Sequence, residues 1–362
     1  MTNNTDCKKI LVYRTGHLGD TLVSLPAFWA IRNAFPDVHL TLLTNVNSYN
    51  SNYVVARSVL PEKGLFDEWL FYPSNLSKSK TIFALLKLFA DIRLKKFDYL
   101  FYLMTRNRSQ ARIRRDEKFF RAAGIKQIFG TDYLARNNLK LNPPPPVPKV
   151  ESELEFLLDC LPSDRFQFDL KSKPELMLTD EEKSFADEWL EANCGTALRE
   201  NRLVAVAPGS KWDSKIWAEE RYEKVVSALI ARHQLFPVIF GGSEDREKSG
   251  RLLQKWKTGA NAAGELNIRQ AAAALAKCRL YLGNDTGTMH LAASVGTRCV
   301  AVFAAVDYAG RWHPFRNNHI ILRETVECEG CHLEVCPIEN LCLNKISVEN
   351  VLAACEKILI EN

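Results

Sequence analysis

The sequence lacks the loops that most often bind nucleotides. It has neither the G-K-[ST] ending of a P-loop nor the G-x-G-x-x-G of a dinucleotide-binding fold. These absences argue against an ATPase and against a dehydrogenase. A D-x-D pattern, which usually joins a diphosphate to a metal ion, is also missing. We therefore expect chemistry that needs neither a cofactor nor a catalytic metal.

Long apolar runs are missing as well. The most lipophilic stretch, 81–94, is interrupted by Lys87 and Asp91 and is too short to cross a bilayer. The first residues, M-T-N-N-T-D-C-K-K, hold no apolar core of a secretion signal. We therefore expect a cytoplasmic protein. In that compartment its ten cysteines are expected to be thiols or metal ligands rather than disulfides.

The positive charge of the chain is concentrated in one segment. The whole sequence has a net charge of +5, whereas 93–121 alone contains ten Lys or Arg residues against three Asp or Glu. Two interpretations remain open for this segment. It is either a solvated helix face or a docking surface for an anionic partner or a membrane.

Apolar runs alternate with amphipathic stretches along the chain, and this alternation predicts parallel sheets with helical crossovers. A length of 362 residues is enough for two separate cores. We expect an N-terminal domain at 1–172 and a C-terminal domain at 173–345. A proline-rich stretch, 143–148, is expected to be a loop or an early linker, and it falls within the bounds of the first domain. A last helix, 346–362, could pack back towards the N-terminal domain.

The first glycine-rich loop reads R-T-G-H-L-G-D at 14–20 and stands between a predicted strand and an amphipathic helix. Asp20 ends this loop near the carboxyl end of the strand, where α/β sheets bind ligands. Two roles remain open for Asp20, a helix cap and a catalytic carboxylate. The G-x-x-G pattern alone does not decide between them.

Two loops of the second half also follow predicted strands. The stretch 207–217 reads A-P-G-S-K-W-D-S-K-I-W and contains Lys215, whose point charge suits a phosphate. The stretch 241–244 reads G-G-S-E, and its Glu244 could accept ribose hydroxyls. These loops indicate a nucleotide site, and neither is specific by itself.

The most specific loop reads G-N-D-T-G-T-M-H at 283–290. It places Asp285 at a strand end and Thr286 to Thr288 at a helix start, where unpaired N–H groups favour a diphosphate. His290 follows in the first turn, either as a ligand contact or as a packed histidine.

Four motifs occur in order along the chain: R-x-G-x-x-G-D-x-x-x-x-x-P at 14–26, P-G-S-x-W-x-x-K-x-W at 208–217, N-D-T-G-x-x-H-L-A-A at 284–293 and R-W-x-P at 311–314. Together they resemble glycosyltransferase family nine, the ADP-heptose:lipopolysaccharide heptosyltransferases, over nearly the whole chain. The resemblance implies a GT-B fold, in which two Rossmann-like domains with parallel sheets face each other across a cleft. It also implies metal-independent, inverting transfer from a nucleotide sugar.

The resemblance also implies roles for individual residues, with Asp20 as general base and Lys215 as phosphate-binding residue. One base is enough because a nucleoside diphosphate is a good leaving group, whereas a glycosidase needs two carboxylates. The expected donor-binding residues are Ser210, Lys215, Glu244, Asp285, Thr286, Gly287, Thr288 and His290.

The acceptor is expected to be an anionic glycolipid of the lipopolysaccharide core, because arginines suit its carboxylates and phosphates. The same surface would touch the inner face of the membrane peripherally, and no nucleic-acid partner is expected. The expected acceptor-binding residues are Gly19, Arg106, Arg108, Arg112, Arg114 and Arg115.

One departure from the family leaves the donor open. The family often has G-P-T-D before R-W-x-P, and this chain reads A-A-V-D at 304–307. ADP-heptose is the expected donor. A transferase of the same fold with another nucleotide sugar, and a non-catalytic module that binds nucleotide or glycolipid, remain the alternatives.

A cysteine cluster stands outside this scheme. It reads Cys328-x2-Cys331-x4-Cys336-x5-Cys342, and four thiols in so short a span could bind zinc. The spacing is irregular compared with paired C-x2-C knuckles. Free thiols are therefore the alternative interpretation.

Overall fold

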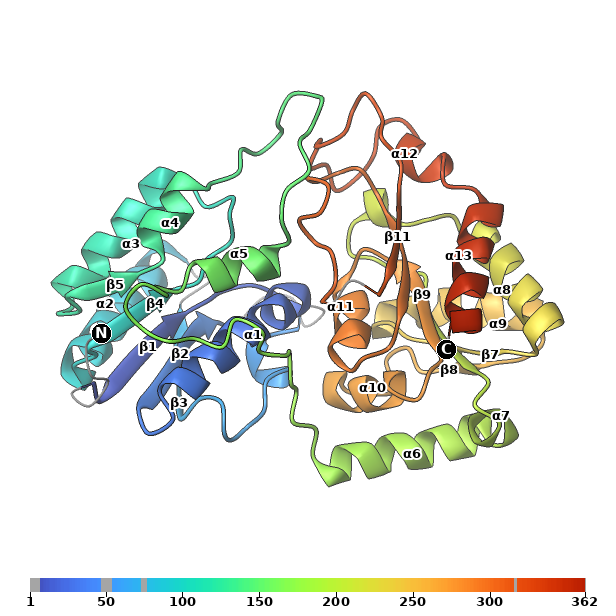
Figure 1. Cartoon of the computed structure of the whole chain (residues 1–362), viewed down its shortest axis with the longest axis horizontal. Helices are drawn as coiled ribbons and strands as arrows, with labels where there is room; N and C mark the ends of the chain where they lie inside the picture. Colours follow the sequence, from blue (N-terminus) through green and yellow to red (C-terminus); the bar gives the residue numbers. More distant parts are fainter. Residues whose placement is uncertain (1–6, 47–53, 73–76, 316–317, 362) are drawn as a thin grey trace. The chain divides into compact units, whose positions relative to one another are not determined.

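The computed structural model describes residues 7–46, 54–72, 77–315 and 318–361, which form two compact units (Figure 1). The N-terminal unit comprises Met1–Leu141 and Glu151–Glu175, and the C-terminal unit comprises Asn142–Val150 and Leu176–Asn362. In the described part of the chain, no helix has both the length and the apolar character needed to cross a membrane.

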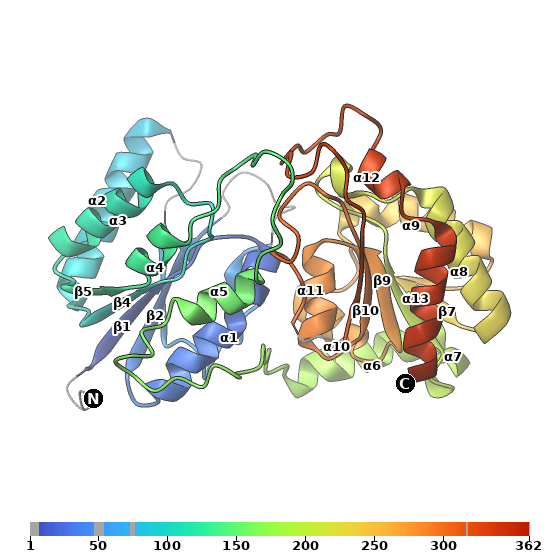
Figure 2. The same cartoon turned by 45° about the horizontal axis from the view of Figure 1, so that its top comes forward.

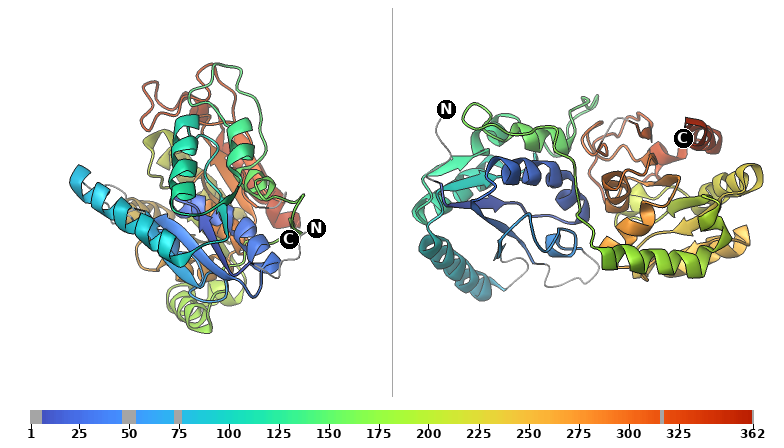
Figure 3. Two further views of the ribbon diagram at one scale, coloured as in Figure 1. Left: turned by 90° about the vertical axis from the view of Figure 1, so that its left-hand side faces the viewer. Right: turned by 60° about the horizontal axis from the view of Figure 1, so that its bottom comes forward.

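The N-terminal unit is built on a parallel sheet with the strand order β3-β2-β1-β4-β5. Helices α1 and α5 pack side by side on one face of this sheet, while α2 and α3 lie together on the other (Figures 2 and 3). The strands are β1 (Lys9–Tyr13), β2 (His39–Asn45), β3 (Glu68–Tyr72), β4 (Tyr99–Tyr102) and β5 (Gln127–Phe129). The helices are α1 (Leu18–Ala34), η2 (Ala56–Ser58), α2 (Lys78–Lys95), α3 (Gln110–Ala122), α4 (Thr131–Arg136) and α5 (Glu153–Asp159).

The C-terminal unit contains a second parallel sheet with the order β11-β10-β9-β6-β7-β8. Its strands are β6 (Leu203–Ala207), β7 (Phe236–Ile239), β8 (Ala260–Asn261), β9 (Leu280–Asn284), β10 (Cys299–Phe303) and β11 (Ile320–Arg323). Its helices are α6 (Asp180–Cys194), α7 (Thr196–Arg199), η3 (Asp213–Lys215), α8 (Glu219–His233), η4 (Ser243–Asp245), α9 (Arg246–Trp256), α10 (Ile268–Leu275), α11 (Gly287–Ser294), α12 (Leu341–Asn344) and α13 (Val348–Glu361).

Both sheets follow the same path. In each, three strands run from the centre to one edge and the chain then returns to the other side of the first strand. This return creates a switch point between β1 and β4 in the N-terminal unit and between β6 and β9 in the C-terminal unit. Open α/β sheets bind ligands at the carboxyl ends of the strands that flank such a point. The predicted parallel sheets are confirmed, and each unit has one expected place for a ligand.

The proline-rich stretch differs from the expected domain division. We expected it within 1–172, but Asn142–Val150 belongs to the C-terminal unit. The Val147 N–H donates to Glu329 Oε1 over 2.8 Å, and the Val150 N–H donates to the Ala309 carbonyl over 2.8 Å. These partners lie far along the chain, so local sequence patterns do not reveal the pairing.

The last helix also packs differently from the expectation that it could return to the N-terminal domain. Helix α13 contacts α8, β9 and β10 of its own unit. Its apolar side, including Val351, Cys355 and Ile358, is fully buried in the core of the C-terminal unit. An apolar side predicts that a helix is packed against a core, but it does not identify which core. Here the core is that of the preceding strands, β9 and β10.

Candidate active site

The loop between β1 and α1 lies at the switch point of the N-terminal unit. Gly16 has a φ of +154°, and a Cβ there would overlap the side chain of Asp20. Only glycine therefore allows the carboxylate to fold back over the loop. The Gly16 N–H donates to Asn45 Oδ1 at the end of β2 over 2.7 Å, which fixes the other side of the loop. Gly19 lies half-buried in the first turn of α1.

Asp20 is held by two groups while part of its side chain remains accessible. Its Oδ2 accepts from the His17 N–H over 3.0 Å, and its Oδ1 lies 3.3 Å from Arg14 Nη2. Arg14 also donates from Nη1 to the Leu103 carbonyl after β4, over 3.1 Å. The Asp20 side chain is 21% exposed. The N-cap of α1 is therefore His17 and not Asp20, which is the third residue of the helix and accepts from the N-cap N–H.

A buried ion pair marks the switch point of the C-terminal unit. Lys215 Nζ, in η3 after β6, lies 2.6 Å from Asp285 Oδ2, directly after β9. The two side chains are only 17% and 6% exposed. The ring of Trp212 lies 5.4 Å from the Lys215 ammonium and adds a cation–π contact. The sequence indicated both residues separately, and the structure brings them together.

Asn284 holds the loops around this ion pair in place. It is fully buried, and its Oδ1 accepts from the Tyr222 hydroxyl over 2.8 Å and from the Trp217 N–H over 3.2 Å. Its Nδ2 donates to the Pro208 carbonyl over 2.9 Å and to the Gly209 carbonyl over 3.4 Å. One side chain thus joins the end of β9 to both ends of the loop after β6. The sequence analysis gave Asn284 no role beyond its place in a motif.

Replacing Asn284 with alanine should destabilise the C-terminal unit. Each buried partner left unpaired is expected to cost about 1–3 kcal/mol of the free energy of unfolding. The matched control, Tyr222→Phe, removes only one of these hydrogen bonds and should cost about 0.5–1.5 kcal/mol. Urea denaturation of both variants measures the difference. Equal losses would contradict the central role of Asn284.

Three small residues begin α11 next to Asp285. Thr286, Gly287 and Thr288 are half-buried, and Thr286 is the N-cap of the helix. The first N–H groups of a helix have no partner within it, so this end suits a negatively charged group. His290 is 6% exposed, and its ring centroid lies 6.4 Å from that of Trp312, which places it beside the R-W-x-P motif.

A second ion pair joins the loops after β6 and β7. Lys211 pairs with Glu244, and Ser210 Oγ accepts from the Trp212 N–H over 3.2 Å. Burial alone would raise the pKa of the Glu244 carboxyl, but the hydrogen bond from Lys211 outweighs it and leaves this pKa below its ordinary value. Glu244 is therefore an ionised acceptor at neutral pH, as contact with ribose hydroxyls would require.

Arg106, predicted to bind an acceptor, lies inside the N-terminal unit. It is 6% exposed, its N–H donates to Glu153 Oε1 over 3.0 Å, and its Nη1 lies 3.4 Å from Glu151 Oε1. The guanidinium also lies 4.7 Å from the centre of the Phe156 ring. These contacts tie the end of β4 to α5, so most of the Arg106 side chain faces the protein.

The other predicted acceptor residues lie on or near α3 and differ in exposure. Arg108 and Arg115 both pair with the buried carboxylate of Asp116, Arg115 at 2.8 Å. Arg108 is 13% exposed, whereas Arg115 is 58% exposed. Arg112 and Arg114 lie on the exposed surface of α3. Among the predicted acceptor residues, Arg112, Arg114 and Arg115 are thus the ones that face solvent.

A buried charged cluster near the A-A-V-D stretch carries residues that the sequence analysis did not select. Asp307 lies 3.1 Å from Arg311 Nη1 and accepts from Trp312 Nε1 over 2.8 Å, with His332 Nε2 at 3.5 Å. Burial would raise the pKa of Asp307, but first the charge of Arg311 and then the interactions with His332 and Trp312 hold it below its ordinary value. For His332, burial first and then Arg311 and Lys215 lower the pKa, against the opposing effect of Asp307. The A-A-V-D and R-W-x-P stretches contain Asp307, Arg311 and Trp312, whereas His332 lies in no predicted motif.

The four cysteines of the cluster differ in burial. Among the residues that the structure describes, no three His, Cys, Asp or Glu side chains converge to hold a metal ion. Cys342 is buried and its Sγ accepts from the Ala305 N–H over 3.4 Å, whereas Cys328 is exposed. Burial, followed by the charges of neighbouring cysteines, raises the pKa of the Cys328 thiol.

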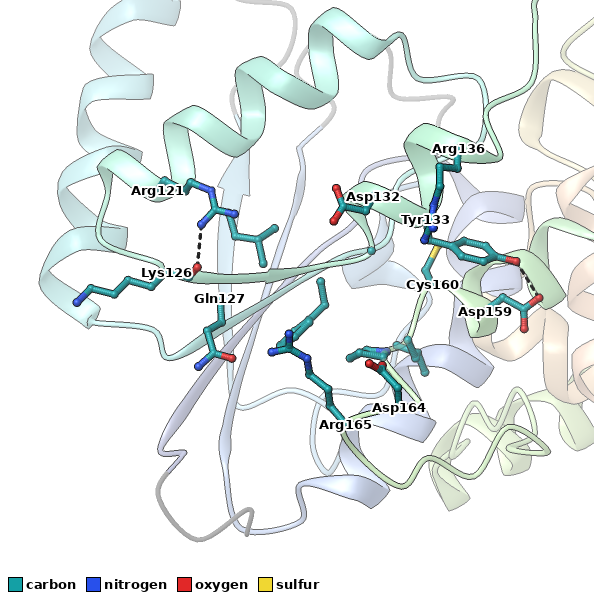
Figure 4. Close-up of a pocket in the computed structure, with 15 residues that line it drawn as sticks. Arg121, Lys126, Gln127, Asp132, Tyr133, Arg136, Asp159, Cys160, Asp164 and Arg165 are labelled. Carbon is teal, nitrogen blue, oxygen red and sulfur yellow. Dashed lines mark hydrogen bonds between the residues drawn. The ribbon is translucent and has the colours of Figure 1, made fainter. Parts of the chain in front are cut away.

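A separate polar pocket of about 480 Å³ lies along β5 and α4 of the N-terminal unit (Figure 4). Arg121 donates to the Lys126 carbonyl over 2.9 Å at one end, and the Tyr133 hydroxyl donates to Asp159 Oδ2 over 3.2 Å at the other. None of the predicted site residues lines it. The pocket therefore plays no part in the site described above.

Solved structures with the same fold cover nearly the entire chain. A glycosyl transferase family 9 protein from Veillonella parvula matches with a TM-score of 0.73 at 22% identity, over 98% of both chains. The ADP-heptose lipopolysaccharide heptosyltransferase II of Escherichia coli matches with a TM-score of 0.65 at 18% identity, over 98% of this chain and 99% of that one. These likenesses confirm the predicted GT-B-like α/β fold.

Sequence relatives cover shorter stretches. The lipopolysaccharide heptosyltransferase 2 of E. coli K12 is 29% identical over 139 residues, which are 36% of this chain and 37% of that enzyme. A lipooligosaccharide heptosyltransferase 2 of Campylobacter jejuni is 25% identical over 166 residues, 44% of this chain and 51% of that one. The chain thus matches between about a third and a half of these relatives. The family model described as glycosyltransferase family 9 (heptosyltransferase) matches residues 86–342. A match of this extent shows that the chain belongs to glycosyltransferase family 9.

Proposed function

We propose that the protein transfers a heptose from ADP-heptose to an acceptor in the lipopolysaccharide core, with inversion and without a metal ion. The observation that carries this proposal is the buried Lys215–Asp285 pair at the start of α11. A lysine and a helix N-terminus together can take the place of a metal as partners of a diphosphate. The names of the sequence relatives support the heptose, and an E. coli heptosyltransferase of the same fold was solved with ADP-2-deoxy-2-fluoro heptose.

The donor half of the reaction belongs to the C-terminal unit. Asp285 holds Lys215 with one hydrogen bond, and the ammonium group has three donors, so it retains others for a phosphate oxygen. The N–H groups of Gly287 and Thr288 offer further donors. As the bond between the sugar and the diphosphate breaks, its electron pair leaves with ADP. The added negative charge is stabilised by groups that are already in position.

The acceptor half belongs to the N-terminal unit. The oxygen of an acceptor hydroxyl attacks the anomeric carbon on the side opposite the diphosphate, which inverts the configuration. Asp20 takes the hydroxyl proton as the new bond forms, since a carboxylate can accept it once the hydroxyl becomes acidic in the transition state. The cations of Arg112, Arg114 and Arg115 suit the phosphates and carboxylates of the acceptor.

Another nucleotide sugar is the alternative donor. The A-A-V-D stretch departs from the family pattern, and its Asp307 lies in the buried cluster with Arg311 and Trp312. A non-catalytic binding module is disfavoured because Asp20, Lys215 and Asp285 are all present and each lies at a switch point.

Transfer should be fastest with ADP-heptose and should continue after exhaustive treatment with EDTA. The physical reason is that Lys215 and the start of α11 supply the positive charge that a metal would otherwise provide. Transfer to a heptose-acceptor fragment is measured with ADP-heptose, other ADP-sugars and UDP-sugars, with magnesium added back in parallel. A faster reaction with another nucleotide sugar would replace the proposed donor. A strict need for added metal would exclude the proposed mechanism.

A further inference from the structure

Helix α2 lies on the outside of the N-terminal unit and is drawn in blue-cyan in Figure 3. Several of its large apolar side chains are exposed to solvent, and together they form an apolar stripe. Leu88 and Ile92 anchor the opposite side of this helix in the core, with exposures of 4% and 0%. The exposed members of the stripe are Ile82 (61%), Phe83 (72%), Leu86 (62%) and Leu94 (78%). Soluble proteins rarely leave several large apolar side chains together on one helix face.

The spacing of these residues makes the stripe continuous. Ile82, Leu86 and Leu94 recur at multiples of four residues, and Phe83 projects about 100° around the helix from Ile82, so the four fall within an arc of about 120°. At 100° per residue, this side is directed away from Leu88 and Ile92. The stripe therefore has no partner in the core of its own unit.

Cations border the stripe. Lys80, Lys87, Arg93 and Lys96 are exposed along α2 and at its end, whereas Asp91 is the only acidic residue in Lys78–Lys95. An apolar side flanked by Lys and Arg is the pattern of a helix that lies in the plane of a membrane surface.

Helix α3 adds further positive charge beside α2. The rings of Phe89 and Phe119 lie 5.7 Å apart, and Arg93 donates to the Ala122 carbonyl over 3.3 Å, so the two helices are neighbours. Arg112 and Arg115 share the side of α3 that carries Phe119, because these residues recur at helical spacing. They therefore lie on the side of α3 that is turned towards α2.

We propose that the outer surface of α2, bordered by Arg112 and Arg115 of α3, binds an anionic lipid bilayer. The apolar stripe would enter the boundary between headgroups and acyl chains, while the cations meet the negative headgroups. The proposal rests on the proposed function in one respect, since a glycolipid acceptor would be reached at such a surface. A protein partner would need an apolar groove and would not require anionic lipid.

The test measures sedimentation of the full-length chain with vesicles in the absence of donor and acceptor. Wild type should bind vesicles of phosphatidylglycerol and phosphatidylethanolamine, and binding to pure phosphatidylcholine should be at least about tenfold weaker because the cations then lack a partner. The Phe83→Glu/Leu86→Glu variant should lose at least about tenfold in binding to the anionic vesicles. Its matched control, Val335→Glu/Ile360→Glu, changes two equally exposed apolar residues of the C-terminal unit and should bind like wild type.

A soluble acceptor fragment separates this proposal from the proposed function. The Phe83→Glu/Leu86→Glu variant should keep the circular dichroism spectrum of wild type and its turnover on that fragment, because both positions face solvent. Undiminished vesicle binding by the variant would contradict the proposal that α2 binds the membrane. Equal binding of wild type to neutral vesicles would contradict it as well. Failure of wild type to bind any vesicle would also contradict the membrane proposal, but it would not affect the proposed transfer activity. Loss of turnover on the soluble fragment would assign the stripe to acceptor binding instead.

Discussion

Asp20→Asn should lower the turnover of heptose transfer by a factor of about one hundred to ten thousand, the usual contribution of a general base. Asparagine keeps an oxygen that can accept from the His17 N–H, so the cap of α1 is preserved. It cannot take the proton of the acceptor hydroxyl. Because the proposed donor contacts lie in the other unit, affinity for the donor should change by less than roughly threefold.

Single-turnover transfer and equilibrium binding of ADP, measured on one preparation, test this result. The matched control is Asp132→Asn, which changes an exposed acidic residue in the first turn of α4. It should leave turnover unchanged. Asp20 would be excluded as the base if its variant kept turnover within roughly threefold of wild type, a loss too small for general base catalysis.

Lys215→Met should weaken ADP binding and also slow the chemical step, by a combined factor of about one hundred to one thousand. The substitution removes a charge from the position where the leaving diphosphate becomes more negative. It also leaves the Asp285 carboxylate, 6% exposed, without its partner. An unpaired buried carboxylate would repel the diphosphate, so the single variant overstates the contribution of the lysine.

The double variant Lys215→Met/Asp285→Asn separates these two effects. It should recover part of the ADP affinity and stability lost in Lys215→Met, but little of the turnover. Lys255→Met is the control, since that lysine pairs with Glu223 outside the predicted site and is 42% exposed. Binding of adenosine is compared with binding of ADP in each variant. Equal weakening of both ligands would show that Lys215 does not contact phosphate.

Much of the fold was accessible from sequence because its signals are local. The buried strands β1, β6 and β9 are short apolar runs followed by glycine or polar loops, and these patterns identify a parallel sheet. Three edge strands, β5, β8 and β11, were not predicted. They have three, two and four residues, which is too short for a clear alternating or apolar pattern.

In the site, too, residues near strand ends could be predicted from the sequence, whereas contacts between distant segments could not. The Gly16 turn, Lys215 and the start of α11 follow strand ends directly, so their positions could be predicted. The burial of Arg106 depends on carboxylates of Glu151 and Glu153, which are 45 and more residues away. The Asp307 cluster likewise joins residues from separate loops. Ion pairs between distant segments leave no periodic pattern, and this is why the basic segment could not be divided correctly from sequence.

The path of Asn142–Val150 has a consequence for synthesis of the chain. Translation completes this stretch long before residues 309 and 329, whose carbonyl and carboxylate it pairs with, have left the ribosome. Until then its backbone N–H groups have only water as a partner. During translation, Asn142–Val150 is therefore an unpaired loop between the two segments that form the N-terminal unit. The C-terminal unit is thus completed only after residue 329 has been made, although its first segment lies between two segments of the N-terminal unit.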